Sequence, residues 1–190
     1  GDGDPSTTAG LLVMPGPETL PPVHAGRRVR VQGHVTEDKA DNPRGTMTVL
    51  RATRIDARGE GTVAATKLSA PPADWEALEG MRVQVEATLS LDGTDARSGQ
   101  TLASLAGRLW TPTELADPGS DRNRQVEADN ARRRIVLDDA SNRRDPDKLW
   151  YLPQGEVRGS TAAGAEGIVD QRHGGWRLQL IGPVQGAVAQ

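Results

Sequence analysis

The chain has 190 residues, of which 35% are hydrophobic, and it carries a formal net charge of −3 with no Cys and no Phe. The absence of Cys excludes disulfides, thiolate metal sites and a cysteine nucleophile. The negative charge disfavours a dedicated double-stranded DNA binder, because phosphate neutralisation drives that binding. No apolar run approaches the ~20 residues that span a bilayer.

The first third of the chain predicts a tail followed by two strands. Residues 1–24 are rich in Gly, Pro and Thr, and their one apolar stretch, Leu11–Met14, is expected to pair as an edge strand. Residues 28–35 alternate between apolar or Gly positions and polar positions, which is the period of a half-buried strand. A second strand is predicted over residues 46–55, with a bulge near Val49 where the apolar parity shifts.

The next elements are a strand over 62–68, a short helix, and strands over 81–91 and 101–109. The helix is predicted over Asp74–Glu79, because Pro residues precede it and a Gly ends it. This order of three strands, a helix and two strands is typical of an oligonucleotide-binding (OB) barrel, although a generic meander with an added helix is the alternative.

The C-terminal part predicts a polar connector over 112–129, a strand over 134–137 and a Gly-rich hairpin within 157–181. We therefore predict an all-β fold of two OB-like small barrels with one short helix. The predicted division is a linker or tail over 1–24, an OB-like barrel over 25–112 and a second OB-like module over 113–190.

The basic residues concentrate in one region, which an aromatic pair follows. OB grooves bind single strands by combining cations that track phosphates with aromatic rings that stack on bases. The predicted nucleic-acid-binding residues are Arg132, Arg133, Arg134, Arg143, Arg144, Trp150 and Tyr151. The alternative is a solvated charged face, because acidic residues interleave with the basic ones.

A turn-rich acidic segment offers oxygen ligands of the kind that Ca²⁺ accepts. The candidate ligands are Asp139, Asn142, Asp145 and Asp147, but their spacing does not fit an EF-hand. The alternative is a loop held by Asx-turn hydrogen bonds. No other cofactor is expected.

Several isolated residues are expected to have ordinary structural roles. His24, His34 and His173 share no metal-ligand spacing and no motif with a nucleophile, so we predict surface or turn histidines. Trp75 and Trp110 are predicted to fill the barrels, since Phe is absent and large side chains are scarce.

Three motifs in order carry a family resemblance: Leu78–Val83 (LEGMRV), Gly107–Thr113 (GRLWTPT) and Asn130–Asp139 (NARRRIVLDD). Together they resemble the region upstream of the catalytic domain in large secreted bacterial endonucleases of the ExeM/NucH type. The resemblance spans roughly residues 24–183. Ala140 is a departure, because that family has Gly after the two Asp residues.

The resemblance implies OB-fold modules that precede a C-terminal, metal-dependent nuclease domain. It therefore predicts a non-catalytic accessory region of a secreted or surface nuclease, located outside the cell, on its surface or in the periplasm. The expected partner is single-stranded DNA or RNA, bound weakly. The alternative is a structural spacer or protein-docking module that does not contact nucleic acid. No acid–base pair or nucleophile in the sequence indicates an independent enzyme.

Overall fold

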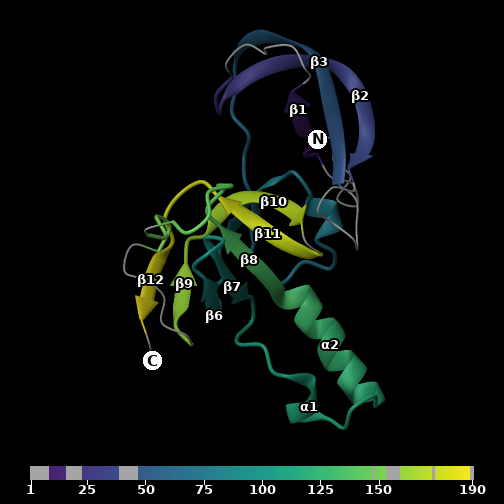
Figure 1. Ribbon diagram of the computed structural model, residues 1–190, viewed down its shortest axis with the longest axis vertical. Helices are drawn as coiled ribbons and strands as arrows, with labels where there is room; N and C mark the ends of the chain where they lie inside the picture. Colours follow the sequence, from purple (N-terminus) through teal and green to yellow (C-terminus); the bar gives the residue numbers. More distant parts are fainter. Residues whose placement is uncertain are drawn as a thin grey trace.

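The computed structural model describes residues 9–15, 23–38, 47–146, 148–152, 159–172 and 174–188 of the chain. Most of the regular structure is β-strand, arranged in a three-stranded sheet and a nine-stranded sheet, with two α-helices and one 3₁₀ turn (Figure 1). The predicted all-β class with a short helix is confirmed. None of the helices in the described part of the chain is long and apolar enough to cross a membrane.

The three-stranded sheet has the order β1-β3-β2, formed by β1 (Leu12–Pro15), β2 (Arg27–Asp38) and β3 (Met47–Glu60). The apolar stretch in the N-terminal tail thus forms the predicted edge strand, which runs parallel to β3. Bulges occur in the β2–β3 hairpin, but at Thr53 and Arg58, where the register skips one residue. The predicted bulge near Val49 is wrong, since Val49 pairs with Thr36 in an unbroken register.

The nine-stranded sheet has the order β12-β9-β6-β7-β8-β11-β10-β5-β4. Its pairs are antiparallel except β4–β5 and β8–β11. The strands are β4 (Thr66–Leu68), β5 (Arg82–Val85), β6 (Leu89–Asp95), β7 (Gln100–Ser104), β8 (Arg134–Asp138), β9 (Thr161–Ala163), β10 (Glu166–Arg172), β11 (Gly175–Leu180) and β12 (Gln185–Val188).

The predicted long strand over 81–91 is divided into β5 and β6 by residues 86–88. β5 pairs with β10, whereas β6 pairs with β7 and β9, so two segments only three residues apart in sequence occupy distant places in the sheet order. Such a short link requires the sheet to curl until its two parts approach each other. The curled sheet encloses its inner face as a partial barrel does.

This sheet combines strands from both predicted modules. Across residue 112, β7 pairs with β8, β5 with β10 and β6 with β9. The strands predicted for the first barrel are in turn shared between the two sheets, because β2 and β3 belong to the sheet that also contains β1. The division in the structure therefore follows the two sheets and differs from the predicted boundary at residues 112 and 113.

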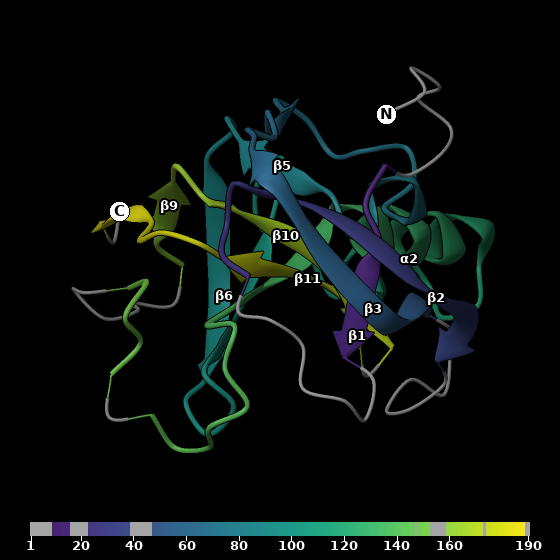
Figure 2. The same ribbon diagram turned by 90° about the horizontal axis from the view of Figure 1, so that it is seen from above.

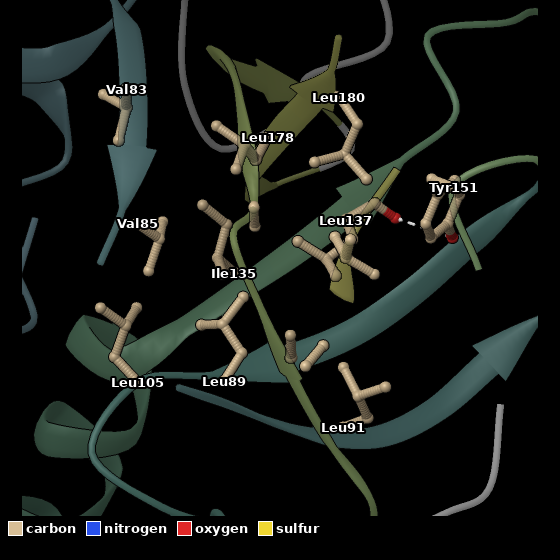
Figure 3. Packing of buried hydrophobic residues seen from close by; sticks show 14 of the residues in the cluster. Val83, Val85, Leu89, Leu91, Leu105, Ile135, Leu137, Tyr151, Leu178 and Leu180 are labelled. Carbon is tan, nitrogen blue, oxygen red and sulfur yellow. Dashed lines mark hydrogen bonds between the residues drawn. The ribbon is translucent and has the colours of Figure 1, made fainter. Parts of the chain in front are cut away.

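The core lies inside the curled sheet (Figure 3). Apolar side chains that alternate along the predicted strands point into it, so the periodicity identified them correctly. The core includes Trp75, Val83, Val85, Leu89, Leu91, Leu105, Ile135, Leu137, Tyr151, Leu178 and Leu180, all of which are buried. The predicted role of Trp75 as a core residue is confirmed, and its indole N–H donates to the carbonyl oxygen of Arg132 at 2.9 Å.

The predicted short helix is a single 3₁₀ turn, η1 (Glu76–Leu78). The predicted polar connector over 112–129 is wrong, because it forms α1 (Pro112–Leu115) and most of α2 (Asp121–Arg133). Ser120 caps α2 by accepting a hydrogen bond from the Asn123 N–H at 3.1 Å. The buried face of α2 has only one apolar residue, so hydrophobic periodicity could not reveal this helix.

The three-stranded sheet lies over the nine-stranded one (Figure 1), and the view from above shows β2 and β3 crossing β10 and β11 (Figure 2). The N-terminal segment meets the larger sheet at Gly10 and Gly80. A Cβ added to Gly10 would lie 2.1 Å from the backbone carbon of Gly80, so any other residue at Gly10 would clash. A cavity of about 790 Å³ lies between the two sheets.

Candidate nucleic-acid interface

The predicted basic cluster lies around β8, with α2 entering at one end of the strand and the loop after Asp138 leaving at the other. Arg132 and Arg133 form the last turn of α2, and Arg134 begins β8. Cations in the last turn of a helix interact favourably with its dipole, so these positions have a local structural reason to be basic.

Arg133 is engaged in a clasp within the protein. Its guanidinium donates to the carbonyl oxygens of Leu105, Ala106, Gly107 and Arg108 at 2.7–3.0 Å. It also forms an ion pair with Asp129 at 3.0 Å. Hydrogen bonds from Arg133, and then from Arg132, hold the pKa of the Asp129 carboxyl below its usual value. The prediction that Arg133 binds phosphate is therefore corrected, because its donors already hold the 105–108 loop.

The other two arginines of this triplet are exposed. Arg132 pairs with Asp129 at 2.9 Å, so one acidic residue serves two cations. Arg134 forms no ion pair with any described residue and points away from the core, since its neighbour Ile135 is buried. Of the predicted triplet, Arg134 is the residue best placed to contact a ligand.

Arg143, Arg144 and Trp150 lie at the opposite end of β8. The backbone N–H of Asp145 donates to the Arg97 carbonyl at 2.9 Å, which ties their loop to the turn between β6 and β7. Arg134 and Asp139 are five residue steps apart along an extended chain, a distance of about 17 Å at ~3.3 Å per residue. The predicted binding residues therefore form two groups and not one patch.

Trp150 is an exposed ring with a fixed orientation. Its side chain is 44% accessible to solvent, and its indole N–H donates to the Asp139 carbonyl at 3.1 Å. One side contacts the Tyr151 ring edge-on, with centroids 5.8 Å apart. Arg143 and Arg144, on the same loop, are also exposed. The loop thus presents an anchored aromatic ring and two cations close together in sequence.

Tyr151 is fully buried, so its predicted role in base stacking is wrong. Its hydroxyl bonds to Thr101 Oγ1 at 2.9 Å and donates to the Gly99 carbonyl at 3.1 Å. Figure 3 shows the ring beside Leu137 at one end of the core. Tyr151 was predicted as a ligand contact because it belongs to the aromatic pair that follows the basic residues, but it is part of the buried core.

The acidic loop forms the turn structure that was the alternative to a metal site. Asp138 Oδ1 accepts the Ala140 N–H at 3.0 Å, and Asp139 Oδ1 accepts the Ser141 N–H at 2.9 Å. These are Asx turns. Burial raises the pKa of the Asp139 carboxyl. Asn142 and Asp145 are exposed, Asp147 lies outside the described residues, and no group of three metal-ligating acids or histidines occurs among those described.

The two described histidines lie outside both groups. His24 and His34 are exposed, as predicted for surface residues, and His173 lies outside the described residues. The two described histidines contribute nothing to the geometry around β8.

Sequence reasoning missed a second exposed aromatic residue. Trp110 is 43% accessible to solvent, so the prediction that it fills the core is wrong. The Arg108 guanidinium lies 4.0 Å from the centre of its ring in a cation–π contact. Asn130 Nδ2 donates to the Trp110 carbonyl at 2.8 Å, which holds this segment against α2. The spacing of Arg108 and Trp110 could have suggested the contact, whereas their exposure depends on α2.

A buried ionic network crosses the face of the larger sheet below the cavity. Arg177 pairs with Asp138 at 2.9 Å and with Asp170 at 3.1 Å. Gln100 donates to Asp138, and Gln179 donates to Asp170. The alternation along β11 would place Arg177 on an exposed face, because it lies on the face opposite the buried Leu178. Arg177 is nevertheless buried.

Glu79 lies beside this cavity and faces the three-stranded sheet. Burial raises the pKa of its carboxyl to about 7, and the charge of Glu76 contributes, while a hydrogen bond from the Thr48 backbone N–H opposes the shift. Since Thr48 belongs to β3, the Glu79 carboxyl joins the two sheets and changes charge near neutral pH.

Comparison with family models, curated proteins and solved structures gave no match to this chain. The resemblance to the ExeM/NucH-type endonucleases therefore remains a prediction.

Proposed function

We propose that the chain is a non-catalytic module that binds single-stranded DNA or RNA weakly, through Trp150, Arg143 and Arg144. The observation that carries the proposal is the anchored, half-exposed Trp150 ring on the loop that also carries two exposed arginines. Anchoring lowers the entropy lost when a base stacks on the ring. Arginine supplies the phosphate contacts that single-strand binders combine with stacking.

Weak binding is expected because the chain has a net charge of −3 and its arginines are widely paired. Arg132 and Arg133 share Asp129, which removes them from the set of strong phosphate contacts. Long-range attraction to nucleic acid is correspondingly small. The resemblance to secreted endonucleases would make this module an accessory region that holds substrate for a C-terminal nuclease domain outside the cell.

Fluorescence anisotropy with a labelled single-stranded oligonucleotide at low salt tests the proposal. Stacking contributes about 1–3 kcal/mol per base, so Trp150→Ala should weaken binding roughly 5- to 150-fold. Trp110→Ala is the matched control, because Trp110 is equally exposed at the other end of β8. The double variant Arg143→Ala, Arg144→Ala should flatten the salt dependence. The slope of the logarithm of the binding constant against the logarithm of the salt concentration should fall by roughly 0.7 for each phosphate contact that the variant removes.

The second candidate is a spacer or docking module that does not contact nucleic acid. The burial of Tyr151 and the clasp of Arg133 favour it, because both remove predicted contacts. Absence of binding at high protein concentration would support the spacer, and equal binding by the Trp150→Ala and Trp110→Ala variants would contradict the assignment of binding to Trp150. We also expect no cleavage of DNA or RNA with Mg²⁺ or Ca²⁺, and cleavage that disappears on mutating an acid of this chain would contradict that expectation.

A further inference from the structure

The β2 strand forms an open edge of the three-stranded sheet. It runs over twelve residues, Arg27–Asp38, and pairs with β3 on one side, while no described residue pairs with its other side. A long edge strand presents a row of backbone donors and acceptors that can pair with another strand. Natural proteins usually block such an edge with charges, Pro or bulges. The side chains along β2 therefore indicate which kind of strand could pair with it.

An apolar stripe runs along one face of this edge. Val29, Val31 and Val35 alternate along β2, and their partners across the hairpin are Ala57, Ile55 and Leu50. Val29 is 40% and Val35 is 63% accessible to solvent. The stripe has the period of a half-buried strand, and the described part of the chain covers Val31 in part and leaves Val29 and Val35 exposed.

The charges along β2 are segregated by sign. Arg27, Arg28 and Arg30 occupy its first third, and Glu37 and Asp38 end it. Charged residues of a single sign keep edge strands apart. Segregated charges act differently, because they repel a copy that runs parallel and attract a copy that runs antiparallel. Opposite charges across a strand pair stabilise it, and like charges destabilise it.

We propose that two copies of this chain associate through antiparallel pairing of their β2 edges. A two-fold axis near Gln32 places Val29 of each copy opposite Val35 of the other, and Arg27 opposite Glu37 of the other. The two apolar stripes then share one face, since side chains alternate with a period of two and this register preserves the parity. The same patch serves both copies, so the assembly closes as a dimer.

The existing contacts of these charges are compatible with pairing. Arg27 bonds to Glu60 at 2.6 Å, Glu37 accepts the Thr48 hydroxyl at 2.8 Å, and Asp38 lies 3.7 Å from Arg51. All three of these contacts join β2 to β3, so none of them uses the outer backbone edge of β2. The copies therefore gain a strand pair without breaking the hairpin.

Analytical ultracentrifugation of the full chain over a range of concentrations tests the proposal. We expect a monomer–dimer equilibrium that shifts toward monomer as salt rises, because the ends of the interface are charge pairs. An acidic-edge variant, Arg27→Glu with Arg28→Glu, should stay monomeric. A basic-edge variant, Glu37→Lys with Asp38→Lys, should also stay monomeric.

An equimolar mixture of the acidic-edge and basic-edge variants is the decisive measurement. Each variant repels itself, but their edges are complementary in charge, so the mixture should form a heterodimer. The matched control is Arg122→Glu with Arg124→Glu, which changes the charge equally on α2 and should dimerise like the parent. Circular dichroism checks that each variant is folded.

The outcomes decide the proposal. A parent chain that remains monomeric at every concentration would overturn it. So would dimerisation by either edge variant alone, or folded edge variants whose mixture remains monomeric. None of these results depends on nucleic-acid binding, so the proposed function is tested separately.

Discussion

The strand over 28–35 and the strands over 82–91 have the same alternation of apolar and polar residues, yet their surroundings differ. Val83, Val85, Leu89 and Leu91 are buried in the curled nine-stranded sheet, whereas Val29 and Val35 are exposed in the three-stranded sheet. Alternation makes one face of a strand apolar, but burial needs a second layer to cover that face. The larger sheet covers its own inner face by curling, and the hairpin of β2 and β3 is too narrow to do so.

The largest difference between the two sheets should be in the stability lost when an ionic contact is removed. Removing one partner of a buried ion pair typically costs about 3–5 kcal/mol, whereas an exposed pair contributes about 0–1 kcal/mol. Arg177→Met removes the centre of the buried network, and Arg54→Met removes an exposed pair with Asp56 on β3. Urea unfolding should show a large decrease in stability for the first variant and little change for the second. Equal decreases would mean that the buried network is not a stabilising unit.

Truncation of apolar side chains should reveal a difference in stability effect between the two sheets that is almost as large. Leu137→Ala in the core should lower the free energy of unfolding by about 2–5 kcal/mol, because it removes buried area and leaves a cavity. Val35→Ala, on the exposed stripe, should change it by less than about 0.5 kcal/mol. Both values come from denaturant melts at low protein concentration, where the proposed dimer is dissociated. A large effect of Val35→Ala under these conditions would show that the stripe is covered in the monomer.

The junction of the sheets should make stability depend on pH. The pKa of Glu79 is raised to about 7 in the folded state, so folding favours the protonated carboxyl. The resulting stabilisation is complete below the pKa of the unfolded chain and is lost as pH rises through about 7. Each tenfold difference in proton affinity between the two states corresponds to about 1.4 kcal/mol. Glu79→Gln should therefore flatten the decline in stability between about pH 4.5 and 7. Glu127→Gln, at an exposed site on α2, should retain the parent's profile.

The smallest effect concerns the clasp between α2 and the larger sheet. Arg133→Ala removes five hydrogen bonds and should destabilise the chain by about 2 kcal/mol. Arg132→Ala, which removes one exposed pair with the same Asp129, should cost less than about 1 kcal/mol. Thermal melts compare the two neighbours. Similar effects would mean that the clasp contributes little, which would return Arg133 to the set of possible phosphate contacts.

Local sequence pattern determined the positions of most strands and much of the core. The alternation at Val83, Val85, Leu89 and Leu91, and again at Leu178 and Leu180, identified buried side chains because a pleated strand has a fixed period of two. An edge strand was also predicted at Leu11–Met14, which overlaps the observed β1 at Leu12–Pro15, since apolar residues stand out in a polar tail. The Asx turns after Asp138 had a local cause and were foreseen as an alternative.

Strand pairing was decided by the tertiary structure, because the sequence of a strand does not specify which other strand it pairs with. The link over 86–88 sends β5 and β6 to distant places in the sheet order, and strands before and after residue 112 therefore meet in one sheet. The pairing of the strands also sets the exposure of single residues. It buries Tyr151, leaves Trp110 and Trp150 exposed, and covers Arg177 with its two acidic partners. The aromatic side chains among these look alike in sequence, and only their distance from the enclosed face of the curled sheet distinguishes them.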